Sequence, residues 1–144
     1  SDLRVLQREG RISNADLAER VHLSASACHR RVQRLEASGA IRGYVALLDA
    51  RRLSVPATVF VDITLQAQAD EVLEAFEQAV RRVPAVLECH LMAGTADYIL
   101  KVVAEDTEDF ARIHRQYLTR LPGVAQMKSS FALRTVSATT ALPV

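Results

Sequence analysis

The sequence lacks several features that would place a protein in a special class. It contains no tryptophan, only two cysteines, and no apolar run near the roughly 20 residues that a membrane-spanning helix needs. Cys28 and Cys89 stand far apart without a C-x-x-C pair, so we expect two reduced thiols rather than a disulfide framework or a zinc cluster. The first residues also lack the long apolar core of a signal peptide. These absences predict a protein of the cytoplasm with no membrane contact.

Motifs of common catalytic and cofactor-binding sites are also missing. The chain has no glycine-rich phosphate loop, no H-E-x-x-H and no G-x-S-x-G. Cys89 and His90 are adjacent, and neighbouring residues of a strand point to opposite faces, so they do not form a nucleophile and base pair. The four histidines show no metal-ligand spacing. We therefore expect neither an enzyme nor a cofactor nor a metal.

Charge is distributed unevenly along the 144 residues, although the net charge is only +1. Residues 1–52 hold ten arginines against six acidic residues, whereas residues 53–144 hold eight basic and eleven acidic residues. The apolar content of 49% is typical of a folded chain. A basic front part and an acidic rear part indicate two units with different tasks.

The front part has the pattern of short helices. Ser13 and Asp16 form an S-x-x-D start, and apolar residues follow with helical spacing at Leu17, Ala18 and Val21. Ser24 is a second candidate N-cap, and the helix after it has apolar positions at Cys28, Val32 and Leu35 and ends near Ser38. Gly39 fits the position after that helix, where a positive φ is common. Residues 3–6 have the pattern of the end of an earlier helix.

Two helices joined by so short a turn predict a helix-turn-helix, whose second helix enters the major groove of DNA. The face of this second helix that lies opposite its apolar positions is polar and cationic. Arginine and glutamine side chains bind guanine and adenine edges, and hydroxyls and small residues allow close approach to phosphates. The predicted DNA-binding residues are Ser24, Ser26, Ala27, His29, Arg30, Arg31, Gln33 and Arg34. The alternative is an ordinary solvated helix face.

The rear part alternates strand and helix patterns. A strand is predicted at 58–66, followed by a helix that is capped by Asp70 and ended by Pro84. Two strands follow at 86–93 and 98–104, joined by the turn "GTAD" at 94–97. The last elements are a helix that starts at Asp106 or Thr107 and a strand at 124–136; the inward residues of this helix are Phe110, Ile113, Tyr117, Leu118 and Leu121. The segments "RVPAV" and "RLPGV" lie 38 residues apart, each between a helix and a strand. This β-α-β-β-α-β order predicts an α+β, ferredoxin-like unit with helices on one face of an antiparallel sheet.

The other face of such a sheet is uncovered in a single chain. Apolar residues such as Val59 or Leu91 are expected there, and exposed apolar patches usually mark an interface. The sequence therefore predicts a homodimer or a larger assembly. The predicted division is a helix-turn-helix domain at 1–50, a polar linker at 51–56 and an effector-binding and oligomerisation domain at 57–144.

The segments "GRISNADLAERVHLS" and "RVQRLEASGAIRGYVALLD" resemble the winged-helix-like helix-turn-helix, and the strand after it, of the Lrp/AsnC (feast/famine) transcription regulators. The rear part resembles the RAM domain of the same family, with Gly94, Asp97 and Tyr98 at the positions of its hallmark hairpin. The resemblance implies dimers joined through their sheets, often octamers, and a small effector, typically an amino acid, bound beside this hairpin.

The hairpin residues implied in effector binding are Met92, Ala93, Gly94, Thr95, Ala96, Asp97 and Tyr98. A free amino acid needs an acceptor for its ammonium, which Asp97 can supply, and N–H donors for its carboxylate, which the backbone of residues 94–96 can supply. Gly94 and Asp97 are equally typical of a simple turn, so both interpretations stay open.

The sequence as a whole predicts a prokaryotic, DNA-binding transcription regulator that responds to a small effector. Its partners are then double-stranded DNA, the effector and further copies of the chain. The alternative is a ligand-binding or oligomeric interaction module that does not bind DNA. A gel shift with random duplex at low salt separates these two functions.

Overall fold

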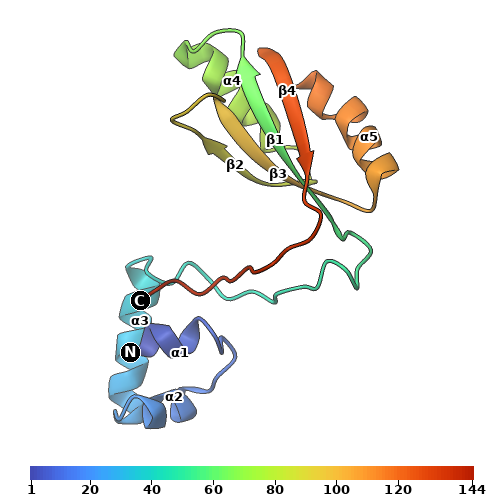
Figure 1. Ribbon diagram of the computed structural model, residues 1–144. Helices are drawn as coiled ribbons and strands as arrows, with labels where there is room; N and C mark the ends of the chain where they lie inside the picture. Colours follow the sequence, from blue (N-terminus) through green and yellow to red (C-terminus); the bar gives the residue numbers. More distant parts are fainter. The chain divides into compact units, whose positions relative to one another are not determined.

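The computed structural model describes residues 1–144 and divides the chain into two compact units (Figure 1). One unit combines Ser1–Leu47 with Val136–Val144, and the other is Leu48–Thr135. The sequence-based division placed residues 136–144 in the second unit, and the structure differs there because this tail packs on the first unit.

Three helices form the first unit: α1 (Asp2–Leu6), α2 (Asn14–Arg20) and α3 (Ala25–Ala37). Leu6, Leu17, Ala18 and Cys28 are the buried core between them. The predicted pair of helices with a short turn and an earlier helix is confirmed. Residues 42–49, where the family resemblance implied a strand, form none in the single chain, because they have no neighbouring strand to pair with.

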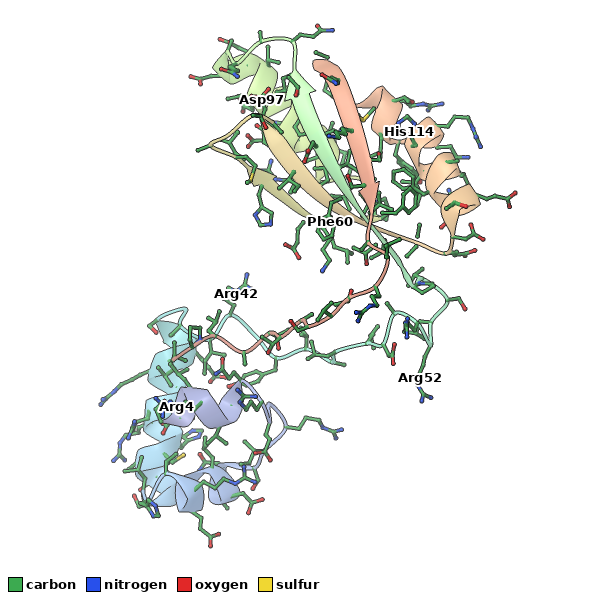
Figure 2. All side chains as sticks on the ribbon, in the orientation of Figure 1. Arg4, Arg42, Arg52, Phe60, Asp97 and His114 are labelled. Carbon is green, nitrogen blue, oxygen red and sulfur yellow. The ribbon has the colours of Figure 1, made fainter.

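The side chains of Arg4 and Gln7, on α1 and directly after it, hold the tail by hydrogen bonds to its backbone. The side-chain amide of Gln7 donates to the carbonyl oxygen of Leu142 at 3.0 Å, and its oxygen accepts the Leu142 N–H at 2.8 Å. Arg4, labelled in Figure 2, donates from Nε to the carbonyl oxygen of Val144 at 2.8 Å. These bonds join residues about 140 positions apart, so no local pattern in the sequence predicts them.

The second unit is a four-stranded sheet with two helices (Figure 1). Its elements are β1 (Ala57–Leu65), α4 (Asp70–Val80), β2 (Val86–Leu91), β3 (Tyr98–Ala104), α5 (Thr107–Gln116), the 3-10 helix η1 (Leu118–Arg120) and β4 (Val124–Phe131). The strand order is β2-β3-β1-β4, and all three pairings are antiparallel. The ferredoxin-like prediction is confirmed.

Alternating residues of the central strands make the core of this unit. The side chains packed together include Val59, Val61 and Ile63 of β1, Leu100 and Val102 of β3, Phe76 of α4, and Phe110 and Ile113 of α5. The period of two in the strands and of 3.6 in the helices turns one face of each element toward this core. The residues between them in β1, Phe60, Asp62 and Thr64, lie on the other face of the sheet.

The prediction that Val59 is exposed on the open face was wrong. Val59 is 0% exposed and belongs to the core. Leu91 is exposed as predicted, at 62%. Its strand partner is Tyr98, whose side chain is buried on the helix side of the sheet, so Leu91 lies on that side too and not on the open face. Alternation with a period of two divides the residues of a strand between two faces, but it does not show which face the helices cover. The prediction for Val59 assigned it to the wrong face.

Three predicted details of the rear unit also differ. Asp70 is the first residue of α4 rather than its cap, since Ala69 precedes the helix without a side-chain bond. The helix α5 ends at Gln116, and the chain tightens into η1, which turns Tyr117 outward while Leu118 stays buried. The last strand ends at Phe131, five residues earlier than expected.

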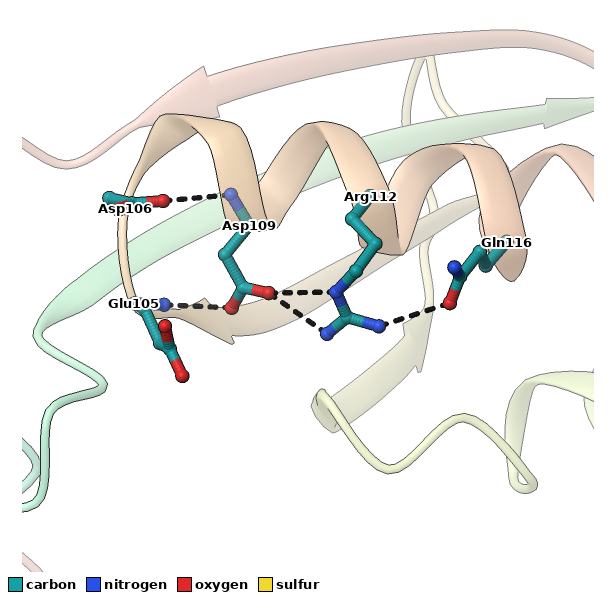
Figure 3. Close-up of polar contacts among 5 residues, drawn as sticks. All are labelled: Glu105, Asp106, Asp109, Arg112 and Gln116. Atoms are coloured by element: carbon teal, nitrogen blue, oxygen red, sulfur yellow. Dashed lines mark hydrogen bonds and ion pairs between the residues drawn. The ribbon is translucent and has the colours of Figure 1, made fainter.

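The start of α5 is fixed by a chain of polar contacts (Figure 3). Asp106 caps the helix by accepting the N–H of Asp109 at 2.8 Å, as the sequence suggested. Asp109 accepts the N–H of Glu105 at 2.9 Å and two bonds from Arg112, which also donates to Gln116. The Glu105 N–H first, and then Arg112, lower the pKa of Asp109 below its usual value.

We expect Gly123→Ala to destabilise the second unit. Gly123 has φ of +73°, and a Cβ at this position would lie 2.9 Å from Cγ1 of Val72 on α4. A left-handed conformation alone costs a non-glycine residue about 1–2 kcal/mol, and the contact adds to that cost. Urea unfolding measures the loss. Gly94→Ala is the control, because its Cβ meets no atom within 4 Å and its φ is not positive; equal stability of the two variants would contradict the argument.

Candidate functional site

Both helices of the helix-turn-helix begin at serine N-caps that the sequence predicted. Ser13 accepts the Asp16 N–H at 3.1 Å at the start of α2, and Ser24 accepts the Ala27 N–H at 3.2 Å at the start of α3. In the turn between them His22 has φ of 57°. Caps of this kind stabilise a helix by about 1 kcal/mol each, so they fix where α2 and α3 begin.

The outer face of α3 is exposed and cationic. Of the eight predicted residues Ala27 is half-buried, and the other seven are exposed: Ser24, Ser26, His29, Arg30, Arg31, Gln33 and Arg34. The side chains of Arg30 and Arg34 form no hydrogen bond or ion pair within the chain, so all their guanidinium donors are available to a partner. Guanidinium groups on a helix of this kind contact phosphates and guanine edges.

Two of the eight predicted residues already have internal tasks. Arg31 forms an ion pair with Asp2 of α1, with 3.3 Å between Nε and Oδ2, and the Asp2 side chain is almost fully buried. Ser24 uses its hydroxyl to cap α3. The role of Asp2 as the partner of Arg31 was not predicted. Its only signal in the sequence is an acidic residue directly before apolar residues of the first helix.

The carboxylate of Asp97 is committed to the sheet. Its Oδ2 accepts the N–H of Leu65 at 2.8 Å, and its Oδ1 accepts from Nε2 of Gln68 at 2.8 Å. The Asp97 N–H donates to the carbonyl oxygen of Ile63 at 2.9 Å. Figure 2 labels Asp97 at the base of the β2–β3 hairpin, next to the end of β1. Asp97 therefore ties the hairpin to β1 and the residues after it.

The rest of the hairpin is divided between exposed and buried residues. Residues 92–95 are exposed, whereas Ala96 is half-buried. Gly94 has open space around it, and its φ is not positive. Tyr98 is buried, its ring lies 4.6 Å from that of Phe76, and its hydroxyl donates to Oε2 of Glu77. Burial, followed by the Glu77 carboxylate, raises the pKa of Tyr98, so the hydroxyl keeps its proton.

Glu77 and Arg81 border a cavity of about 370 Å³ between α4 and β2. The sequence reasoning missed both residues. Their i, i+4 spacing on α4 was the only local signal, and it is common on solvated helices. The bond from Tyr98 to Glu77 crosses from strand to helix and is invisible in the sequence.

Asp97→Ala is expected to lower the free energy of unfolding by about 1–3 kcal/mol, because the part-buried N–H of Leu65 loses its acceptor. Asp97→Asn is expected to lose less, since its oxygen still accepts from Leu65 and a turned Gln68 amide accepts from the new NH₂ group. Urea unfolding of both variants measures the difference. An alanine variant as stable as the native chain would show that these bonds do not support the fold.

The open face of the sheet mixes apolar and charged side chains. Phe60 is 39% exposed, and its cross-strand partners are Lys101 and Ser130. Glu88 accepts from His90 at 2.9 Å and pairs with Lys101 at 3.6 Å. The His90 bond first, and Lys101 after it, lower the pKa of Glu88.

No group of three or more His, Cys, Asp or Glu side chains is positioned to bind a metal ion. The helices are all too short or too polar for a membrane span. The Cys89 thiol lines the cavity beside α4, and burial raises its pKa to about 11, so it is a neutral group at physiological pH.

Two sequence families match this chain. The Lrp/AsnC ligand binding domain matches residues 58–142, which is more than half of the chain, and a winged helix-turn-helix DNA-binding domain matches residues 3–42. The chain belongs to the Lrp/AsnC family of transcription regulators. This regulator is thus a DNA-binding protein and not an enzyme. The alternative of a ligand-binding or interaction module that does not bind DNA is rejected.

Individual relatives extend over nearly the whole regulator. The Bkd operon transcriptional regulator of Pseudomonas aeruginosa is 43% identical over 141 residues, which cover 98% of this chain and 92% of that protein. The leucine-responsive regulatory protein of Escherichia coli is 42% identical over 134 residues, covering 93% and 82%. A Neisseria meningitidis transcriptional regulator crystallised as an L-Met complex superposes with a TM-score of 0.93 at 37% identity, covering 99% of this chain and 92% of that one.

Proposed function

We propose that the regulator binds duplex DNA through the outer face of α3, with Arg30 and Arg34 as the principal contacts. The observation that supports these two residues is their exposure on the recognition helix without an internal partner. Ser26, Ala27, His29 and Gln33 flank them and are proposed to contact base edges and phosphates. Arg31 and Ser24 are proposed to act at the DNA backbone, since part of their bonding capacity is used inside the unit. The regulator would do this in the cytoplasm of a prokaryotic cell.

A gel shift with random duplex DNA tests this proposal without knowledge of the operator. Binding is expected at low salt and should weaken linearly with the logarithm of the salt concentration, because phosphate contacts release counterions. The slope reports the number of phosphates neutralised. Absence of any shift at low salt would overturn the proposed DNA face.

We infer that the response of the regulator is to an amino acid bound by the unit Leu48–Thr135. The match of residues 58–142 to a ligand binding domain and the L-Met complex of the Neisseria relative support this ligand class. The exposed residues Met92, Ala93, Gly94 and Thr95 are the part of the hairpin open to a ligand. A thermal-shift screen of the twenty amino acids tests the inference, and no shift with any of them would contradict it.

Self-association through the open face of the sheet is proposed as well. Phe60 is exposed there between Lys101 and Ser130 of the neighbouring strands, and two copies of this face would cover it. Light scattering of the regulator should therefore give the mass of a dimer or of a multiple of dimers, including an octamer. The mass of a single chain at micromolar concentration would refute the interface.

A further inference from the structure

A buried carboxylate lies beside the recognition helix. The side chain of Asp2 on α1 is 2% exposed, and neither of its oxygens accepts a hydrogen bond within the chain. Its one ionic contact is with Arg31 of α3, where Nε lies 3.3 Å from Oδ2. A buried charge that loses its partner destabilises a protein strongly, so the Arg31 guanidinium cannot move away from Asp2 without a large loss. Asp2 therefore holds one edge of this guanidinium in place.

The contact with Asp2 leaves the outer end of Arg31 available. Only Nε is used, whereas the two terminal nitrogens, Nη1 and Nη2, form no hydrogen bond within the chain, and the side chain is 49% exposed. The N–H groups of a guanidinium lie in one rigid plane, so a fixed Nε also restricts the direction of the terminal N–H groups. Such a fork of donors matches the oxygens of a phosphate.

Arg34 lies next to Arg31 on the same side of α3. Residues three apart on a helix are neighbours on its surface, and both arginines line one cavity of about 280 Å³ together with Asp2 and Leu35. The guanidinium of Arg34 has no contact that fixes it from inside the chain. The pair thus combines an arginine that is oriented from the interior with one that adapts to the DNA.

The ion pair contributes little to stability by itself. Taking two charges out of water costs free energy that their attraction only roughly recovers, and apolar residues of similar size often replace buried pairs without loss. The packing of this unit comes instead from its apolar core of Leu6, Leu17, Ala18 and Cys28. An orientation of Arg31 is what the buried carboxylate supplies and an apolar side chain would not.

We propose that Asp2 is a positioning residue for DNA binding, which aims the terminal N–H groups of Arg31 at a backbone phosphate beside the groove that α3 enters. This inference rests on the proposed DNA face and adds to it a residue that does not touch DNA. An arginine that is already oriented loses less side-chain entropy on binding than a mobile one. A carboxylate, whose charge alone repels phosphates, thereby strengthens the binding of DNA.

Asp2→Asn separates orientation from charge, because the two effects have opposite signs. Asparagine has the same shape but lacks the charge that holds Arg31. If Asp2 positions Arg31, the affinity for random duplex DNA in a gel shift should fall by roughly threefold or more. If Asp2 acts only through its charge, the affinity should rise, since a negative charge near the phosphates is removed. Asp16→Asn removes an exposed carboxylate of the same unit and, as the matched control, should bind no more weakly than the native chain.

A double-mutant cycle shows whether the effect passes through Arg31. The loss caused by Asp2→Asn is expected to disappear in an Arg31→Gln background and to persist in an Arg34→Gln background, because only Arg31 contacts Asp2. A purely structural role of Asp2 would give the same loss in all three backgrounds, and that result would overturn the proposal.

A second variant keeps the test decisive if asparagine disturbs the fold. Asp2→Leu refills the buried position with an apolar side chain, so it should melt near the native temperature and still bind DNA more weakly. Gel shifts are run below the melting temperature of every variant. A native chain that does not shift duplex DNA at low salt would overturn the DNA face itself. A native chain that binds DNA no better than folded Asp2→Asn and Asp2→Leu would overturn only the positioning by Asp2.

Discussion

Replacing Arg30 and Arg34 with alanine is expected to weaken DNA binding by roughly 1–3 kcal/mol for each residue, while the regulator stays folded. Both side chains are exposed on α3 and have no partner within the chain, so their removal breaks no internal contact. If a residue binds phosphate, affinity should fall for all sequences and the salt slope should flatten by about one. If it binds a guanine edge, the loss should be confined to particular operator positions.

Gel shifts at several salt concentrations, with random and with operator DNA, distinguish these two modes. Arg82→Ala is the matched control, because Arg82 is an exposed arginine of the second unit. Unchanged affinity and unchanged salt slope in Arg30→Ala and in Arg34→Ala would remove α3 from the role of recognition helix. An equal loss in Arg82→Ala would show a general charge effect instead.

Phe76→Ala is expected to cost the second unit roughly 3–5 kcal/mol of stability, the typical loss when a buried phenyl ring is removed. The ring is 0% exposed, packs in the core between α4 and the sheet, and is 4.6 Å from that of Tyr98. Its removal leaves a cavity and also frees Tyr98, which orients Glu77. Such a loss is a large part of the stability of an ordinary domain.

Scanning calorimetry measures this effect, and Phe76→Leu is the control, since leucine fills much of the same space and should lose far less. A Phe76→Ala variant that unfolds at the native temperature would show that the core tolerates the cavity.

Local signals in the sequence determined most of the secondary structure. The serines at 13 and 24 have the polar side chains that bind the free N–H groups of a first helical turn, and both were correctly predicted as caps. Gly39 was likewise predicted after α3 and has φ of 82°. The repeated order of strand and helix in residues 57–131 predicted the ferredoxin-like sheet. These features depend on residues a few positions apart, which is why the sequence alone sufficed.

Only the tertiary structure decided which residues meet across the fold. Val59 and Phe60 alternate in the same strand, and the packing of the helices against one face buried the first and exposed the second. Asp97 had the chemistry of either a ligand contact or a turn residue, and its two oxygens accept bonds from residues about 30 positions away. Glu77 acquired its orientation from Tyr98 in the same manner. Strand register and core packing fix such pairs, and these depend on the whole chain, so a pattern of neighbouring residues does not contain them.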